Sequence, residues 1–184
     1  MKKRSKSKKV QLLISNKRVD WGYKQSVLSL QSRIDMQMQK REQKALLVTS
    51  TLPQEGKSLL ALNIALAAKE NGKKTIIIDG DFRNPTVGRM LDFDEKTVGL
   101  SDFFDGKADA EEILVEKDGL YVINSGSRNG GISGIISDSM MQDLMMYLKK
   151  TFDMIIIDTP PAGLFSDADI FAKICRFSIL CCAI

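Results

Sequence analysis

Length and composition limit this chain to one folded domain, because 184 residues that are 43% hydrophobic and 27% charged can bury a full core and are typical of a soluble globular protein. Six of the 27 Lys and Arg residues lie in residues 1–9, and the remaining 21 are matched by 23 Asp and Glu, so the folded part lacks the basic surface that nucleic-acid binding requires. The sequence contains no histidine, which excludes a zinc site and a His-based catalytic triad.

The chain begins with a basic segment. We interpret residues 1–18 as a disordered arm and residues 19–184 as a single folded domain. The arm is either a solvated tail or an electrostatic contact for anionic lipid or an acidic partner. Its apolar stretch is too short for a signal peptide, and no run of about 18 apolar residues occurs, so we expect neither export nor a membrane span.

The rest of the chain alternates between patterns of helix and strand. Residues 19–43 are expected to form an amphipathic helix, with Val27, Leu30, Ile34 and Met38 near helical spacing. The expected strands are 45–50, 74–79, 120–125, 153–158 and 177–184, and the further helices are 57–70, 137–150 and 166–175. This order predicts an α/β fold in three layers, with a mostly parallel central sheet flanked by helices. The Gly- and Ser-rich segment 124–134 follows the carboxyl end of a strand and is therefore expected near the functional site.

A phosphate site is predicted where the first strand meets the first long helix after it. Gly56, Lys57 and Ser58 stand at this junction, in the stretch "TLPQEGKS". The start of a helix presents free backbone N–H groups to an anion. Lys57 adds a charge for the β and γ phosphates and the Ser58 hydroxyl suits Mg²⁺, although Thr51 stands where the usual pattern has its first glycine. We expect Lys57 to be exposed and to contribute little to the core.

Acidic residues end two other strands of the same sheet. Asp79 and Asp81 are two residues apart and are expected to point to the same side, and Asp158 ends another strand. Because the carboxyl ends of parallel strands face the ligand, these carboxylates are expected to share a divalent cation. The alternative is that they only cap turns and loops.

The stretches "TLPQEGKS", "IIIDGDFRNP" and "MIIIDTPP" resemble the Walker A, A′ and B motifs of bacterial tyrosine kinases, which belong to the P-loop NTPase superfamily, and the resemblance covers about residues 45–175. It implies that Asp81 is the catalytic base and that Asp79, Asp158 and Ser58 hold Mg²⁺, with Asp81 beside the metal. The nucleotide would be ATP. Its predicted contacts are Thr51, Pro53, Gln54, Glu55, Gly56, Lys57, Ser58, Leu59 and Arg83. Partitioning ATPases rank second, because Leu52 stands where they carry a signature lysine.

The sequence departs from the family pattern in three places. Gln25, Leu28 and Gln31 align with the E-x-x-R-x-x-R pattern that the family uses for ring assembly. The segment 127–136 carries glycines where the family has a proline-bearing loop, with Gly134 in place of an acid. The tyrosine-rich tail and the last elements of the adenine pocket are missing, so we expect a domain truncated at its C-terminal end.

The resulting expectation is an ATP-dependent, autophosphorylating protein tyrosine kinase that regulates capsular or exopolysaccharide synthesis and export. The alternative is a nucleotide switch that hydrolyses ATP without kinase activity. Cys175, Cys181 and Cys182 cluster in or beside an apolar run, as buried thiols do in a reducing cytoplasm. By resemblance, the partners are a membrane activator protein with a cytoplasmic segment, which would hold the chain at the inner face of the plasma membrane, and protein tyrosine substrates. Homo-oligomerisation stays open.

Overall fold

The structure is a computed structural model that describes residues 21–94, 97–127, 138–165 and 167–182. The basic arm predicted at residues 1–18 lies outside the described residues, and so does the glycine-rich segment from residue 128 to 137. Among the described helices, none is long and apolar enough to cross a membrane.

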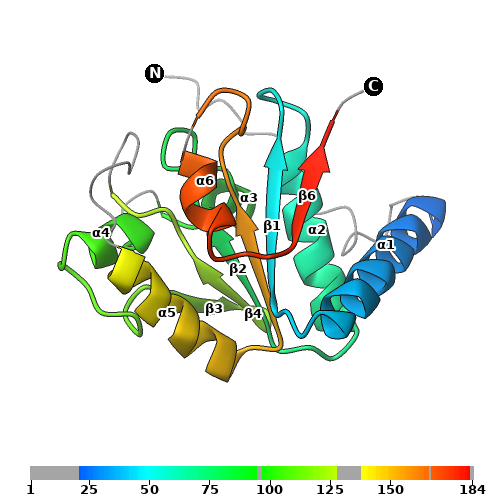
Figure 1. Cartoon of the computed structure of the whole chain (residues 1–184), viewed down its shortest axis with the longest axis horizontal. Coiled ribbons are helices and arrows are strands. Elements are labelled where there is room, and N and C mark those ends of the chain that lie inside the picture. Colours follow the sequence, from blue (N-terminus) through cyan, green and yellow to red (C-terminus); the bar gives the residue numbers. More distant parts are fainter. Residues whose placement is uncertain (1–20, 95–96, 128–137, 166, 183–184) are drawn as a thin grey trace, which may run out of the picture.

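A six-stranded sheet forms the centre of the molecule, in the order β3-β4-β2-β5-β1-β6 (Figure 1). The strands are β1 Ala45–Ser50, β2 Thr75–Asp79, β3 Leu114–Lys117, β4 Leu120–Ile123, β5 Met154–Asp158 and β6 Ser178–Cys181. All neighbours pair in parallel except β3 and β4, which form an antiparallel hairpin. The mostly parallel sheet that the sequence predicts is therefore confirmed, and β3 is an additional edge strand.

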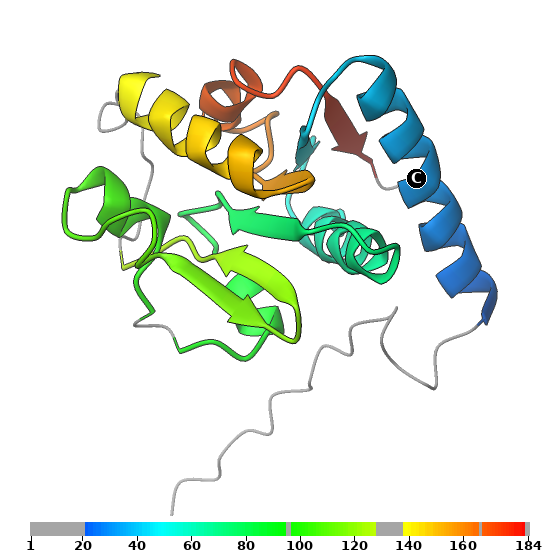
Figure 2. The same cartoon turned by 90° about the horizontal axis from the view of Figure 1, so that it is seen from below.

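Helices cover both faces of this sheet. They are α1 Trp21–Lys40, α2 Lys57–Glu70, α3 Val87–Met90, α4 Leu100–Phe104, α5 Asp138–Thr151 and α6 Asp167–Ala172. Figure 2 shows α5 and α6 on one side of the sheet and α2 on the other, with α1 outermost against α2. The three layers of the predicted fold class are thus present.

Each central strand contributes side chains to two hydrophobic cores, one on each face of the sheet. In β1, Leu46 and Val48 pack with α1, α2 and α3, whereas Ala45 and Leu47 pack with α4, α5 and α6. Side chains alternate across a strand, so a strand covered on both faces has to be apolar at successive positions. This explains the unbroken Ile, Leu and Val runs in the sequence.

The contact between α1 and α2 includes a polar pair. Gln31, which the resemblance aligns with the ring-assembly pattern, is buried in the structure. Its Oε1 accepts a hydrogen bond of 2.6 Å from Nδ2 of Asn71, the residue that follows α2. Gln31 therefore holds α1 on the domain, and its amide is engaged within the chain.

Strand register places the functional residues at one edge. Asp158 lies opposite Val48 of β1 on one side and opposite Asp79 of β2 on the other. The loop after β1, residues 51–56, leads into α2 at this same edge. Strand pairing alone therefore brings the phosphate loop and the acidic residues together, as expected for the carboxyl edge of a parallel sheet.

Candidate functional site

The loop of residues 51–56 is a tight turn that hydrogen bonds within itself hold in place. Oε2 of Glu55 accepts hydrogen bonds from the backbone N–H groups of Thr51 (2.9 Å) and Leu52 (2.8 Å). Gln54 and Gly56 both have positive φ angles, 66° and 81°. The left-handed conformation suits glycine and is unfavourable for glutamine, so the turn holds backbone strain at Gln54.

Lys57 is the first residue of α2 and lies across the site. Its Nζ is 3.0 Å from Oδ2 of Asp81, 3.1 Å from the Ser58 hydroxyl and 3.5 Å from Oδ1 of Asp158. The residue is only 8% exposed, so the expectation of an exposed lysine was wrong. The negative charges of Asp81 and Asp158 hold the Lys57 ammonium inside the site. No other cation among the described residues lies within ion-pair distance of these two carboxylates.

The charges around Lys57 determine its protonation. Burial lowers the pKa of this ammonium, but the negative charges of Asp158, Asp81 and Asp79 outweigh burial and raise the pKa above its ordinary value. Lys57 is therefore a cation at neutral pH.

Asp79 and Asp81 have different partners, although only Gly80 separates them. Oδ2 of Asp79 accepts hydrogen bonds from the N–H groups of Thr86 (3.0 Å) and Val87 (2.9 Å), and its Oδ1 accepts one from Asp81 N–H (3.2 Å). Asp81 instead reaches Lys57. The two side chains diverge because β2 ends at Asp79, so the strand alternation assumed for the sequence does not extend to Asp81.

Asp158 is the carboxylate of the site with the fewest close hydrogen bonds. Both of its oxygens are buried without a close hydrogen bond from the described residues, although Nζ of Lys57 lies 3.5 Å from Oδ1 and the Ser58 hydroxyl also acts to lower the pKa of Asp158. Burial raises the pKa of Asp158 to about 6, against the opposing effect of the Lys57 charge. Burial and the charge of Asp158 raise the pKa of Asp79 to about 7. The site therefore contains more buried negative charge than its one lysine compensates.

These carboxylates fit Mg²⁺ only together with other ligands. Within the described part of the chain, no group of three or more Asp, Glu, Cys or His side chains is arranged to hold a metal. Mg²⁺ is commonly bound through one or two carboxylates, with phosphate oxygens and water as the remaining ligands. The buried oxygens of Asp158 and the Ser58 hydroxyl are consistent with that kind of site.

A cavity of about 440 Å³, which we call the P-loop cavity, opens beside this cluster. Eight of the predicted site residues line it: Pro53, Gln54, Gly56, Lys57, Ser58, Leu59, Asp81 and Arg83. Thr51, Glu55, Asp79 and Asp158 lie outside its lining. Six further residues complete the wall and were not predicted from the sequence: Asn84, Thr86, Arg89, Met90, Pro161 and Phe165. Their places in the sequence could have indicated them, because they follow the carboxyl ends of β2 and β5, where ligands bind in parallel sheets.

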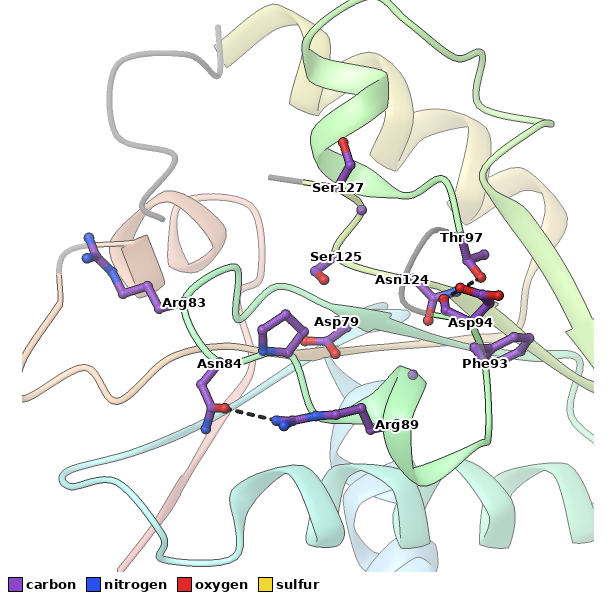
Figure 3. Close-up of a pocket in the computed structure, with 13 residues that line it drawn as sticks. Asp79, Arg83, Asn84, Arg89, Phe93, Asp94, Thr97, Asn124, Ser125 and Ser127 are labelled. Carbon is purple, nitrogen blue, oxygen red and sulfur yellow. Dashed lines mark hydrogen bonds between the residues drawn. The ribbon is translucent and has the colours of Figure 1, made fainter. Parts of the chain in front are cut away.

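A second cavity, of about 400 Å³, adjoins the first, and we call it the Asp79 cavity (Figure 3). It shares Arg83, Asn84 and Arg89 with the P-loop cavity. Residues 124–127 line it, so the start of the Gly- and Ser-rich segment lies beside the P-loop cavity. Figure 3 shows Ser125 and Asn124 on one side of Asp79 and Arg89 on the other.

Comparison with known proteins identifies the family. The sequence model of the AAA domain family matches residues 54–171. Tyrosine-protein kinase CpsD of Streptococcus pneumoniae serotype 4 is 39% identical over 139 residues, covering 74% of this chain and 61% of CpsD. The Staphylococcus aureus protein CapB is 33% identical over 153 residues, covering 82% of this chain and 67% of CapB. The chain belongs to the bacterial tyrosine-protein kinases.

Solved structures share the fold of this chain. The kinase domain of the Escherichia coli tyrosine kinase ETK superposes with a TM-score of 0.86 at 24% identity, covering 97% of this chain and 70% of that domain. The septum site-determining protein MinD of Pyrococcus horikoshii, solved with Mg-ADP, is more distant, with a TM-score of 0.63 at 22% identity. These likenesses show the P-loop NTPase fold. The chain spans about three fifths of the length of CpsD.

Proposed function

We propose that this chain is an ATP-dependent protein tyrosine kinase that regulates capsular or exopolysaccharide synthesis and export. The observation that carries the proposal is the cluster in which Lys57, at the start of α2, lies within 3.5 Å of Asp81, Asp158 and Ser58. A phosphate-binding lysine and a potential base therefore share one cavity. The kinase named CpsD, at 39% identity, supports the same chemistry.

The residues divide the work of phosphoryl transfer between binding and proton transfer. Lys57 and the backbone N–H groups at the start of α2 bind the phosphates of ATP. Asp81 lines the P-loop cavity beside Lys57 and accepts the proton of the tyrosine hydroxyl. The phenol oxygen forms a bond to the γ phosphorus as the bond from phosphorus to the ADP oxygen breaks. Positioning and charge supply most of the rate enhancement in such reactions.

Mg²⁺ would be held by Ser58 and Asp158, and by Asp79 directly or through water, with Asp81 close to it. When bound, the ion neutralises charge on the transferred phosphate. Asp158 is poised for this role because its buried oxygens have no close hydrogen bond from the described residues. The three N–H groups that Asp79 binds fix the turn that carries Asp81.

The proposed partners and location are those that the resemblance to bacterial tyrosine kinases implies. The proposed activator is a membrane protein whose cytoplasmic segment holds this chain at the inner face of the plasma membrane. The substrates are tyrosines of other proteins and of the kinase itself. We propose a cytoplasmic protein that binds no nucleic acid, because the sequence outside its first nine residues carries more acid than base.

A phosphotyrosine assay tests the proposal. We expect the chain, incubated with labelled ATP and an activator segment, to produce phosphotyrosine on a supplied protein. Asp81→Asn should retain nucleotide binding and lose transfer by about 100-fold or more, because the base is gone. Asp143→Asn, which changes an exposed acid on α5, is the control and should transfer normally.

The alternative function has its own signature in the same assay. A nucleotide switch would release phosphate from ATP without forming phosphotyrosine. The phosphotyrosine signal would then stay at background in the unchanged chain and in Asp81→Asn alike. Normal tyrosine phosphorylation by Asp81→Asn would remove the base role from Asp81 and leave the nucleotide site in place.

A further inference from the structure

The Asp79 cavity adjoins the P-loop cavity, in which we propose that phosphoryl transfer takes place. Its wall includes Asp79, whose Oδ1 accepts the N–H of Asp81, and Asp81 lines the P-loop cavity. The two cavities share Arg83, Asn84 and Arg89. A chain whose tyrosine reaches Asp81 can therefore place a neighbouring residue at this shared wall, because successive residues of an extended peptide advance by about 3.3 Å.

The two arginines of the shared wall differ in their partners. Arg83 donates from Nε to Oδ2 of Asp167 at 3.0 Å, and its guanidinium lies 4.3 Å from the centre of the Phe165 ring. Arg89 donates only to neutral oxygens, at 2.9 Å to Oδ1 of Asn84 and at 3.5 Å to the Thr86 hydroxyl. It is exposed and forms no ion pair with any residue that the structure describes. Of the two arginines in the shared wall, Arg89 is thus the one whose charge no described residue compensates.

The acids of the cavity do not neutralise Arg89. The oxygens of Asp79 already accept three backbone N–H groups. Figure 3 shows the guanidinium of Arg89 directed toward Asn84, whereas Asp94 lies on the other side of the cavity, beside Phe93 and Thr97. An anionic group that enters near Asn84 therefore meets a positive charge.

The remaining wall suits a peptide. Asn124 has a buried Nδ2 with no hydrogen-bond acceptor among the described residues. An unmet buried donor is costly, so an incoming carbonyl would lower the free energy of the site once Asn124 adjusts toward it. Pro85 and Phe93 add apolar surface. One available cation with a single amide and apolar contacts matches one acidic residue of a polypeptide better than it matches a second polyphosphate.

We infer that the Asp79 cavity is a specificity subsite for the acceptor chain, in which Arg89 binds the carboxylate of an Asp or Glu next to the tyrosine that is phosphorylated. This inference rests on the proposed kinase function and adds a substrate class, tyrosines flanked by acidic residues. Arg89 acts by binding and takes no part in proton transfer.

Peptide binding with Mg-ADP present tests the subsite without requiring turnover. Two fluorescent peptides are compared, each with one tyrosine, flanked on both sides by glutamates in the first and by glutamines in the second. We expect the full chain to bind the glutamate peptide about fivefold more tightly in fluorescence anisotropy, the effect of one partly screened charge-assisted hydrogen bond. The ratio of the two affinities cancels any effect of Arg89 on the nucleotide.

Variants then locate the origin of the ratio. Arg89→Gln should bring it to about one, Arg89→Lys should keep part of it, and Arg89→Glu should shift the preference to a lysine-flanked peptide. Arg33→Gln is the control for net charge. It removes an exposed arginine from α1, the outermost helix on the α2 side of the sheet. It should leave the ratio unchanged. Thermal unfolding of each variant verifies that the fold is retained.

Opposite outcomes separate this inference from the proposed function. A ratio near one in the unchanged chain, or a ratio that Arg89→Gln preserves, would overturn the subsite. Equal loss in Arg33→Gln would also overturn it, because the preference would then reflect overall charge. Selective binding without phosphotyrosine formation would refute the kinase proposal and leave the peptide site intact. Phosphorylation that does not depend on flanking acids would refute the subsite and leave the kinase proposal intact.

Discussion

Asp158 shows how a single residue can be placed for function at the expense of stability. Its oxygens are buried without close hydrogen bonds from the described residues, and it faces Asp79 on the neighbouring strand. Lys57 compensates only part of this charge, because the pKa values of Asp79 and Asp158 remain raised to about 7 and about 6. Sites prepared for a ligand commonly hold such unfavourable groups until the ligand arrives.

The raised pKa values predict how stability depends on pH in the nucleotide-free protein. An unfolded aspartate titrates near 3.9, so between about pH 4 and pH 7 the folded state binds more protons than the unfolded state. The free energy of unfolding contributed by Asp79 and Asp158 therefore falls as the pH rises through this window. We expect Asp158→Asn to increase stability at pH 8 by about 2 kcal/mol and to weaken the pH dependence.

Urea unfolding at pH 5 and pH 8 measures this effect. Asp143→Asn, an exposed change on α5, should follow the unchanged protein at both pH values. Lower stability of Asp158→Asn at pH 8 would show that Asp158 stabilises the fold through its attraction to Lys57, contrary to this expectation.

At the scale of elements, the loop between β1 and α2 combines a rigid brace with a strained residue. Glu55 fixes the start of the loop, and Gln54 is exposed with a φ of 66°. Because the Gln54 side chain is exposed, we attribute the cost at this position to the backbone. A left-handed conformation costs an ordinary residue about 1–2 kcal/mol, and a β-branched residue tolerates it least.

Substitutions at Gln54 test the strain directly. We expect Gln54→Gly to be at least as stable as the unchanged chain and Gln54→Val to be less stable than Gln54→Gly by about 1–2 kcal/mol. The same two substitutions at Gln37, an exposed position of α1, serve as the control. There the order should reverse, since glycine is the poorer residue in a helix. Chemical denaturation gives all four values, and an identical order at both positions would contradict backbone strain at Gln54.

The elements that the sequence predicts best are those that fill the cores. The helix expected at 57–70 is found as Lys57–Glu70, and the strand expected at 45–50 as Ala45–Ser50. β3 was missed because it is a short, half-buried edge strand with little apolar signal. The four-residue α3 was missed because its first turn depends on the carboxylate of Asp79, a contact made through the folded turn.

The same limit applies to the site at the scale of the whole molecule. Lys57, Asp81 and Asp158 could be placed together because strand ends of a parallel sheet meet at one edge. Arg89 and Asn124 could not, since they come from α3 and from the residue that follows β4, and only the fold sets them on one cavity. The burial of Lys57 was also missed, because ion pairs with Asp81 and Asp158 depend on side-chain directions that spacing does not give.

Coupling between the nucleotide site and the proposed activator is a property of the whole molecule. In the structure Lys57 is engaged by carboxylates, while residues 51–54 of the phosphate loop are exposed. Releasing Lys57 from these carboxylates toward phosphate costs free energy, which contacts from a partner can offset. We therefore expect the activator's cytoplasmic segment to tighten Mg-ATP binding.

Reciprocity makes this expectation measurable in two independent ways. If the segment tightens Mg-ATP binding by some factor, Mg-ATP must tighten binding of the segment by the same factor, and a coupling of about 5- to 150-fold is typical. Isothermal titration of the segment into the chain, with and without Mg-ATP, gives one factor, and titration of Mg-ATP with and without the segment gives the other. Lys57→Met removes the cation proposed to bind the phosphates, so Mg-ATP should no longer affect binding of the segment to this variant. Equal affinities of the segment in both titrations would refute the activation mechanism. They would leave the assignment of Lys57, Asp81 and Asp158 to the proposed kinase site unchanged.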